Sequence, residues 1–184
     1  MRKIVLFASV AVFLLMGYAF TGVAADHSYV GVGKCKMCHK SKAKGDQYGI
    51  WLKSAHSKAY ETLASDESKA VAAKLGLEGD PQQLDQCLSC HVTGHGVAAE
   101  LLGKNYKVED GVGCESCHGP GGDYWKSSVM KDREKAVAAG MIVPDEKTCV
   151  QCHNEKSPTF KEFDYEKMVA KIAHPYPDKA EKKE

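Results

Sequence analysis

CKMCH at 35–39, CLSCH at 87–91, CESCH at 114–118 and CVQCH at 149–153 repeat one pattern, Cys-x-x-Cys-His, in this 184-residue chain. The four copies use all eight cysteines. In this pattern two thiols add to the vinyl groups of a porphyrin, and the adjacent histidine supplies a nitrogen to the iron. The sequence therefore predicts four covalently bound haem c groups, each with its iron.

In every copy the two cysteines are predicted to attach the haem and the histidine is predicted to bind its iron. The predicted haem-attaching cysteines are Cys35, Cys38, Cys87, Cys90, Cys114, Cys117, Cys149 and Cys152. The predicted proximal iron ligands are His39, His91, His118 and His153.

Disulfides and zinc are the alternatives, because Cys-x-x-Cys pairs also form redox disulfides and zinc knuckles. A zinc knuckle does not require a histidine directly after the second cysteine. A disulfide framework would scatter single cysteines along the chain. The motif histidines therefore favour haem over both alternatives.

One further histidine is present for each predicted haem. The four outside the motifs are His27, His56, His95 and His174. Two histidine ligands keep an iron six-coordinate, which suits electron transfer, whereas an open sixth position would admit a substrate. The count favours an electron carrier with histidine as the distal ligand. The rival distal ligand is methionine, available at Met37, Met130, Met141 and Met168.

The N-terminus resembles a secretory signal, with a basic start at 1–3, an apolar run at 4–20 and small residues at 23–25. We expect a signal peptide at 1–25, a tetrahaem domain at 26–176 and a charged, disordered tail at 177–184. The alternative is an uncleaved membrane anchor; after cleavage no stable membrane span is expected. Export to the periplasm or beyond the cell fits haem c chemistry. A net charge of +1 with interspersed signs gives no indication of nucleic-acid binding.

The mature chain is short for its cofactors, with about forty residues per haem, too few for a large core of their own. The haems should form much of the core of one compact, mainly α fold with long loops. Helices are expected over 46–63, 66–75, 132–139 and 164–173, and a helix begins at Asp80-Pro81 and leads into the second motif. Loop structure, with a short hairpin closing at 109–111, is expected over 93–113.

Four longer stretches carry a family resemblance: GVGCESCHGPGGDY at 111–124, WLKSAHSKAY at 51–60, YVGVGKCKMCHK at 29–40 and CHNEKSPTFKEFDYEKMVAKIAHP at 152–175. They resemble the tetrahaem cytochrome c-554 family and its relatives around hydroxylamine oxidoreductase. The resemblance implies a mostly helical fold, haems stacked in close parallel and perpendicular pairs, and electron transfer as the function.

The resemblance also implies distal ligands. His56 matches the distal ligand of the haem at Cys114, and His174 matches that of the first haem. Some family members carry a distal histidine shortly after CHGPG, where this chain has residues 122–125 without one. One member has a five-coordinate second haem and an aromatic residue at the position of His95. Because His95 lies only four residues after His91, it is expected to serve a neighbouring haem, such as the one at Cys149.

His27 would be the second residue of the mature chain, on an arm with nothing else to hold it. If it is a ligand, it could bind a haem of the next subunit and build an open filament. The sequence thus favours an electron carrier. Its expected partners are other redox proteins: cytochromes, quinol-linked oxidoreductases or terminal reductases. The alternatives are a filament subunit, and a nitrogen oxide or hydroxylamine enzyme at a five-coordinate haem.

Overall fold

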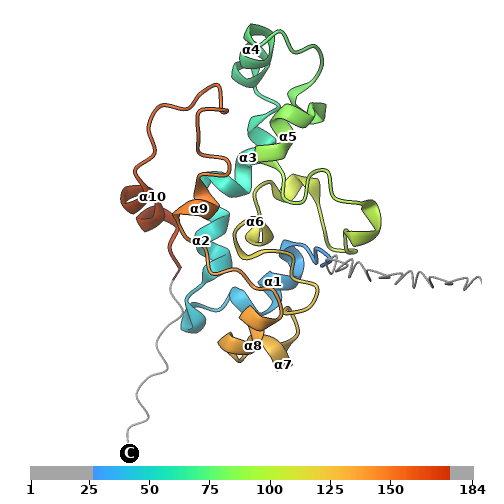
Figure 1. Cartoon of the computed structure of the whole chain (residues 1–184), viewed down its shortest axis with the longest axis vertical. Coiled ribbons are helices and arrows are strands. Elements are labelled where there is room, and N and C mark those ends of the chain that lie inside the picture. Colours follow the sequence, from blue (N-terminus) through green and yellow to red (C-terminus); the bar gives the residue numbers. More distant parts are fainter. Residues whose placement is uncertain (1–26, 175–184) are drawn as a thin grey trace, which may run out of the picture.

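The computed structural model describes residues 27–174. The expected signal peptide and charged tail lie outside the described residues. Within 27–174 the chain forms short helices joined by long loops, with an isolated bridge between Tyr29 and Leu102 and no strand (Figure 1). The predicted fold class, mainly α with long loops, is confirmed.

The α-helices are α1 (Val32–His39), α2 (Gln47–Lys53), α3 (Ala59–Thr62), α4 (Asp66–Lys74), α5 (Asp85–His91), α6 (Cys114–His118), α7 (Ser127–Met130), α8 (Arg133–Ala138), α9 (Glu146–Cys149) and α10 (Tyr165–Ile172). The 3-10 helices are η1 (Lys42–Lys44), η2 (Ala55–Lys58), η3 (Pro81–Gln83), η4 (Ala99–Leu101) and η5 (Val108–Asp110). Along the long axis, α4 and α5 lie toward one end and α1, α7 and α8 toward the other, with α6 and α9 between (Figure 1).

Side-chain caps set several helix starts where the sequence predicts them. Asp80 accepts a hydrogen bond from the backbone of Gln82 at 3.0 Å, with Pro81 in the first turn. Asp132 and Asp164 cap α8 and α10 in the same way. A carboxylate at this position satisfies an amide that has no partner inside the helix.

The helix predicted over 46–63 is divided into α2, η2 and α3. The Ser54 hydroxyl donates to the Trp51 carbonyl at 2.7 Å, and the Ser57 hydroxyl donates to the Leu52 carbonyl at 2.9 Å. Serine side chains that bond locally to the backbone compete with the α-helical pattern. The resulting 3-10 segment contains His56 and decides where its ring points.

The hairpin predicted within 93–113 is wrong. This segment forms η4 and η5, and its residues 101–103 bond to Tyr29 instead of to a second strand within 93–113. The Tyr29 amide donates to the Leu101 carbonyl at 2.8 Å, and the Gly103 amide donates to the Tyr29 carbonyl at 2.7 Å. A partner from a distant part of the chain therefore replaces the local turn.

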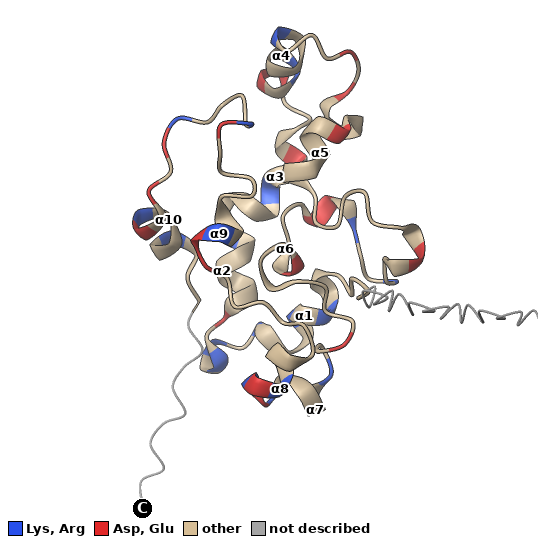
Figure 2. Ribbon diagram, in the orientation of Figure 1, with Lys and Arg blue, Asp and Glu red and all other residues tan. Residues whose placement is uncertain are grey.

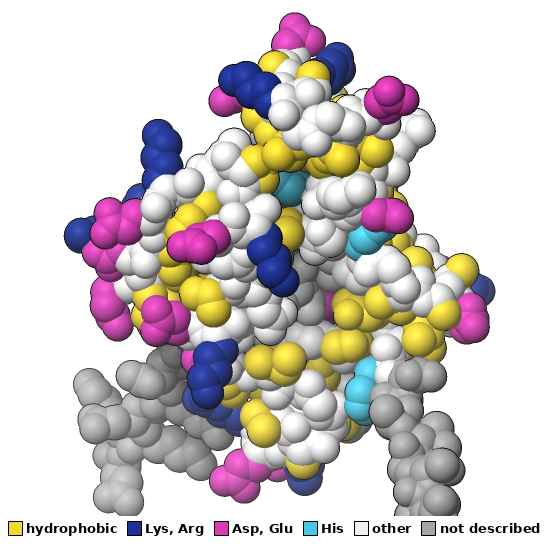
Figure 3. Space-filling model, turned by 45° about the horizontal axis from the view of Figure 1, so that its top comes forward, with side chains coloured by type: hydrophobic (Ala, Val, Ile, Leu, Met, Phe, Trp, Pro, Cys, Tyr) yellow, Lys and Arg dark blue, Asp and Glu magenta, His cyan; other side chains and the backbone are white. Residues whose placement is uncertain are grey.

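The polypeptide buries few large apolar side chains. The buried apolar residues within 27–174 are Val32, Leu63, Ala72, Val92, Tyr124 and Ala136. Larger ones reach the surface, including Met37, Leu52, Leu75, Ile142 and Val143. Figure 3 shows hydrophobic side chains at several places on one face of the molecule. Apolar surface left in contact with water is unfavourable, and flat apolar porphyrins are a suitable cover. This pattern fits a protein whose cofactors complete its core.

The N-terminal segment is held firmly, contrary to the expectation of an unattached arm. Glu115, between the two cysteines of the third motif, is only 5% exposed. Its carboxylate accepts hydrogen bonds from the backbone amides of Val30 (2.8 Å), Gly31 (2.8 Å) and Gly121 (2.6 Å). The Gly122 amide also donates to the Ser28 carbonyl at 2.8 Å. A Cβ atom on Gly122 would lie 2.4 Å from the Ser28 hydroxyl oxygen, so the close approach requires glycine.

Replacing Glu115 with alanine should destabilise the holoprotein by about 3 kcal/mol or more, because three buried amides lose their acceptor at roughly 1–3 kcal/mol each. Urea unfolding followed by circular dichroism measures the change. Glu109→Ala, which removes an exposed carboxylate, is the matched control. Equal midpoints for the two variants would show that Glu115 does not hold the segment.

Candidate haem centres

The four motifs occupy equivalent local structures. The motif histidine is the last residue of α1, α5 and α6. In the fourth motif the helix ends at Cys149, and the His153 amide donates to the Cys149 carbonyl at 3.0 Å. Cysteines three residues apart share one side of a helical turn, so each pair can meet the same porphyrin edge. All eight cysteines are free thiols in the structure.

Hydrogen bonds fix the tautomer of three motif histidines. Nδ1 of His91 contacts the Ala59 carbonyl at 2.8 Å, and Nδ1 of His118 contacts the Ile142 carbonyl at 3.1 Å. Nδ1 of His39 contacts the Gln47 side-chain oxygen at 3.3 Å. An oxygen acceptor requires a proton on Nδ1, which leaves the Nε2 lone pair for a metal. The geometry fits axial ligation of iron.

Two histidines from outside the motifs face motif histidines. The ring centroids of His56 and His153 lie 5.9 Å apart at an interplanar angle of 71°. Those of His118 and His174 also lie 5.9 Å apart, at 64°. Nδ1 of His174 contacts the Ile172 carbonyl at 2.9 Å, which again leaves Nε2 for a metal. Facing imidazoles of this kind are suited to a bis-histidine iron.

Burial favours the neutral, metal-binding form of two of these rings. Burial lowers the pKa of His56, and the neighbouring His153 lowers it further. Burial is also the main cause that lowers the pKa of His118; the hydrogen bond to the Ile142 carbonyl opposes it, and His174 and His39 add to it. A neutral imidazole retains the lone pair that an iron needs.

These pairs differ from those implied by the family resemblance. His56 faces the fourth motif instead of the third, and His174 faces the third instead of the first. The 3-10 turn at η2 changes the direction of the His56 side chain relative to a continuous α-helix. His174 lies two residues after the end of α10 and faces His118, which is far from it in the sequence.

The two remaining histidines contact carboxylates. Nε2 of His95 lies 3.1 Å from an Asp85 oxygen, so the nitrogen expected to bind a neighbouring iron is occupied. His27 contacts Asp123 through Nδ1. That contact leaves Nε2 of His27 as the nitrogen for a metal, in the carboxylate–histidine arrangement that often supports metal ligands.

The helices of the four motifs follow one another along the molecule. α1 packs against α6, and α6 and α9 lie between α1 and α5 (Figure 1). The neighbouring Cys114 raises the pKa of Cys35, and Cys35 lowers that of Cys114. Burial and the nearby Cys90 thiol raise the pKa of Cys152 to about 12. The third and fourth motifs therefore lie between the first and the second.

Two comparisons with known proteins found matches. Residues 34–119 match the family model described as cytochrome c554 and c-prime. Cytochrome c-554 of Nitrosomonas europaea is 37% identical over 145 residues, which cover 71% of this chain and 60% of that protein. This chain belongs to the cytochrome c-554 family.

Family membership implies covalently bound haem c, in agreement with the free Cys-x-x-Cys-His motifs. The segment matched by the family model contains the first three motifs, and the fourth lies beyond it. The chain spans 60% of the length of its curated relative. No solved structure matches the chain.

The zinc and disulfide alternatives find no geometric support in this member of the cytochrome c-554 family. Within 27–174 no group of three or more His, Cys, Asp or Glu side chains is placed to hold a metal ion by itself. All eight cysteines are free thiols, with no disulfide between the two cysteines of any motif. The thiols and imidazoles are instead distributed as separate porphyrin attachments require.

Three supporting residues were missed at the sequence level. Glu115 resembles an ordinary surface charge in the sequence, and Asp123 lies in a Gly-rich loop. Phe163 stacks on the His153 ring, with centroids 4.9 Å apart and an interplanar angle of 15°. None carries a motif signal, because each acts through a contact with a residue far away in the sequence.

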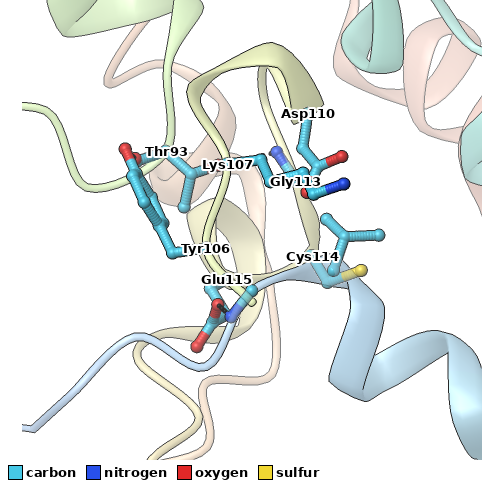
Figure 4. Close-up of a pocket in the computed structure, with 9 residues that line it drawn as sticks. Thr93, Tyr106, Lys107, Asp110, Gly113, Cys114 and Glu115 are labelled. Carbon is cyan, nitrogen blue, oxygen red and sulfur yellow. Dashed lines mark hydrogen bonds between the residues drawn. The ribbon is translucent and has the colours of Figure 1, made fainter. Parts of the chain in front are cut away.

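A cavity of about 10 Å³ lies between the first and third motifs (Figure 4). Its lining includes Thr93, Tyr106, Asp110, Cys114 and Glu115. The Tyr106 hydroxyl donates to the Thr93 carbonyl at 2.6 Å. A volume of this size admits roughly one water molecule. The junction between these motifs is thus closely packed and polar.

His56→Ala and His174→Ala should each convert one low-spin ferric haem to high-spin, because each removes one imidazole of a facing pair. Electron paramagnetic resonance of the oxidised holoprotein, integrated against total haem, measures the change. Lys58→Ala, which removes an exposed side chain two positions after His56, is the matched control and should leave the spin state unchanged. No increase in high-spin signal for either of the first two variants would reject the pairings.

Proposed function

We propose that this family member transfers single electrons along four covalent haems, between redox partners outside the cytoplasmic membrane. The spatial order of the motif helices carries the proposal, because α6 and α9 lie between α1 and α5 and adjacent attachment sites hold adjacent cofactors (Figure 1). The haems would form a ladder in the order first, third, fourth, second. When bound, haem supplies a one-electron iron couple. The chain holds, orients and shields these groups.

Distal ligands follow from the facing pairs. In this proposal His56 serves the fourth haem and His174 the third. His27 serves the first haem, since its segment leads directly into α1 and its ring is oriented by Asp123. His95 is the candidate left for the second haem, and it would have to leave Asp85 to bind that iron. With all four in place, each iron would have two histidine ligands.

The filament hypothesis finds no support among the described residues. His27 is docked on its own chain through Asp123, and the residues after it are bonded to Glu115 and Gly122. His27 would have to break these contacts before it could bind an iron of a neighbouring subunit. Ligation within one chain is therefore the proposal for His27.

One observation favours an enzyme as the second candidate function. The His95–Asp85 contact holds the relevant nitrogen away from iron, which would leave the second haem open on its distal side. An open iron could bind a small nitrogen compound such as nitrite or hydroxylamine. In that case His91 would be the only histidine bound to the iron of the second haem.

The state of the second haem decides between carrier and enzyme. In the proposed carrier, the oxidised, size-selected monomer should give only low-spin ferric signals by electron paramagnetic resonance. One high-spin haem in four that also binds added nitrite or hydroxylamine would support the enzyme instead. A high-spin signal from two or more haems would contradict both versions.

His27→Ala should produce one additional high-spin haem in the monomer, reversed by added imidazole. The signal should not depend on protein concentration, because the ligand comes from the same chain. Asp123→Asn should keep the haem low-spin but raise its reduction potential, since loss of the carboxylate makes the imidazole a weaker donor. A wild-type signal that changes from high-spin to low-spin on concentration would establish ligation between subunits.

Location is part of this proposal. In the described part of the chain, no helix is long and apolar enough to cross a membrane. The N-terminal sequence resembles a cleavable secretory signal. It supports export, which also fits the chemistry of haem c attachment. The proposed partners are other redox proteins, such as cytochromes, quinol-linked oxidoreductases or terminal reductases.

A further inference from the structure

The first motif lies in a strongly basic segment. Residues 34–44 contain five lysines, and no Asp or Glu occurs from 27 to 45. Subtracting these five charges from the net charge of +1 leaves −4 for the rest of the chain. We call the group formed by Lys34, Lys36, Lys40, Lys42 and Lys44, with Lys104 and Lys107, the lysine patch.

Lys104 and Lys107 belong to the patch through space. A pocket of about 270 Å³ is lined by Lys36, Tyr48, Lys104 and Lys107. Asp110 is a carboxylate at the same pocket. Except for Lys34, every lysine of the patch is exposed. The patch therefore presents ammonium groups to solvent around α1.

The second motif has the opposite surroundings. Residues 75–103 contain four carboxylates and no Lys or Arg. These carboxylates, all exposed, are Glu78, Asp80, Asp85 and Glu100. Figure 2 shows acidic positions on α5, whereas basic positions lie on α1 and at η1 toward the other end. The two motifs lie in segments of opposite charge.

These motifs also stand at the two ends of the proposed ladder. The first motif, on α1, and the second, on α5, lie toward opposite ends of the molecule, with the third and fourth between them (Figure 1). The attachment helix of the first motif carries the exposed Lys36, and the exposed Lys40 follows its last residue. An electron partner that docks at this end would approach through the lysine patch.

We propose that the lysine patch is the docking face for a redox protein with an acidic surface, which exchanges electrons with the haem at Cys35 and Cys38. The inference rests on the proposed electron-transfer function and deepens it. Complementary charges attract and orient the partner during encounter, and like charges disfavour the wrong approach. The acidic segment around the second motif repels the same partner. The partner therefore docks at the end of the ladder that carries the lysine patch.

Cytochrome b5, a small acidic haem protein, is a suitable probe. The holoprotein is fully reduced and mixed with ferric cytochrome b5 in a stopped-flow instrument, at low and at high ionic strength. For the wild type, the second-order rate constant should fall as salt rises, because the attraction is screened. Lys40→Glu combined with Lys42→Glu should slow the reaction at low salt by about ten-fold or more.

The matched control is Lys156→Glu combined with Lys161→Glu. Both lysines are exposed on the loop after the fourth motif, and the change in net charge is the same. The control should retain a rate within about two-fold of the wild type at low salt, because steering depends on local charge. Far-ultraviolet circular dichroism and the haem absorption spectrum check that both variants fold and carry their haems.

The outcomes separate the proposals. Equal rates for patch and control variants would overturn the docking face while leaving electron transfer intact. Failure of the reduced wild type to donate electrons to any probe, including basic mitochondrial cytochrome c, would overturn the proposed function itself. A salt-sensitive dimer of the wild type alone, abolished by the patch variant, would assign the patch to a second copy of this chain.

Discussion

A buried carboxylate connects the parts of this structure that the cofactors depend on. Glu115 lies within the third motif and accepts amide hydrogen bonds from residues 30, 31 and 121. Its contacts hold the segment before α1 against α6 and bring Cys35 beside Cys114. A carboxylate with three donors can remain buried because its charge is well solvated by amides. The spacing of the first and third motifs follows from this interaction.

The rest of the chain arranges ligands with little core of its own. Backbone and side-chain oxygens orient the motif histidines through Nδ1, while the facing rings come from η2 and from the residue after α10. The exposed apolar side chains indicate that cofactor contacts complete the packing. Packing and function are therefore coupled, since the groups that carry electrons also supply the apolar surface that holds the helices together.

The distribution of charge distinguishes the two ends of this arrangement. Basic residues surround the first motif and acidic residues surround the second, although the net charge of the chain is only +1. Net charge alone would suggest a neutral surface with no preference among partners. The positions of the motifs in space give the local charges their significance, because α1 and α5 lie at opposite ends of the proposed path for electrons.

The sequence by itself determined the attachment chemistry, the helical class and the starts of α2, α4, α8 and α10. Cys-x-x-Cys-His and the capping residues Asp80, Asp132 and Asp164 act within a few neighbouring residues, so their spacing is readable along the chain. Tertiary structure decided which histidines face each other, where the N-terminal segment is held, and that residues 93–113 pair with Tyr29 instead of forming a hairpin. These features depend on contacts between residues far apart in sequence, which local patterns do not encode. Glu115 is the clearest case, because only the fold turns a charge between two cysteines into the acceptor that joins three segments.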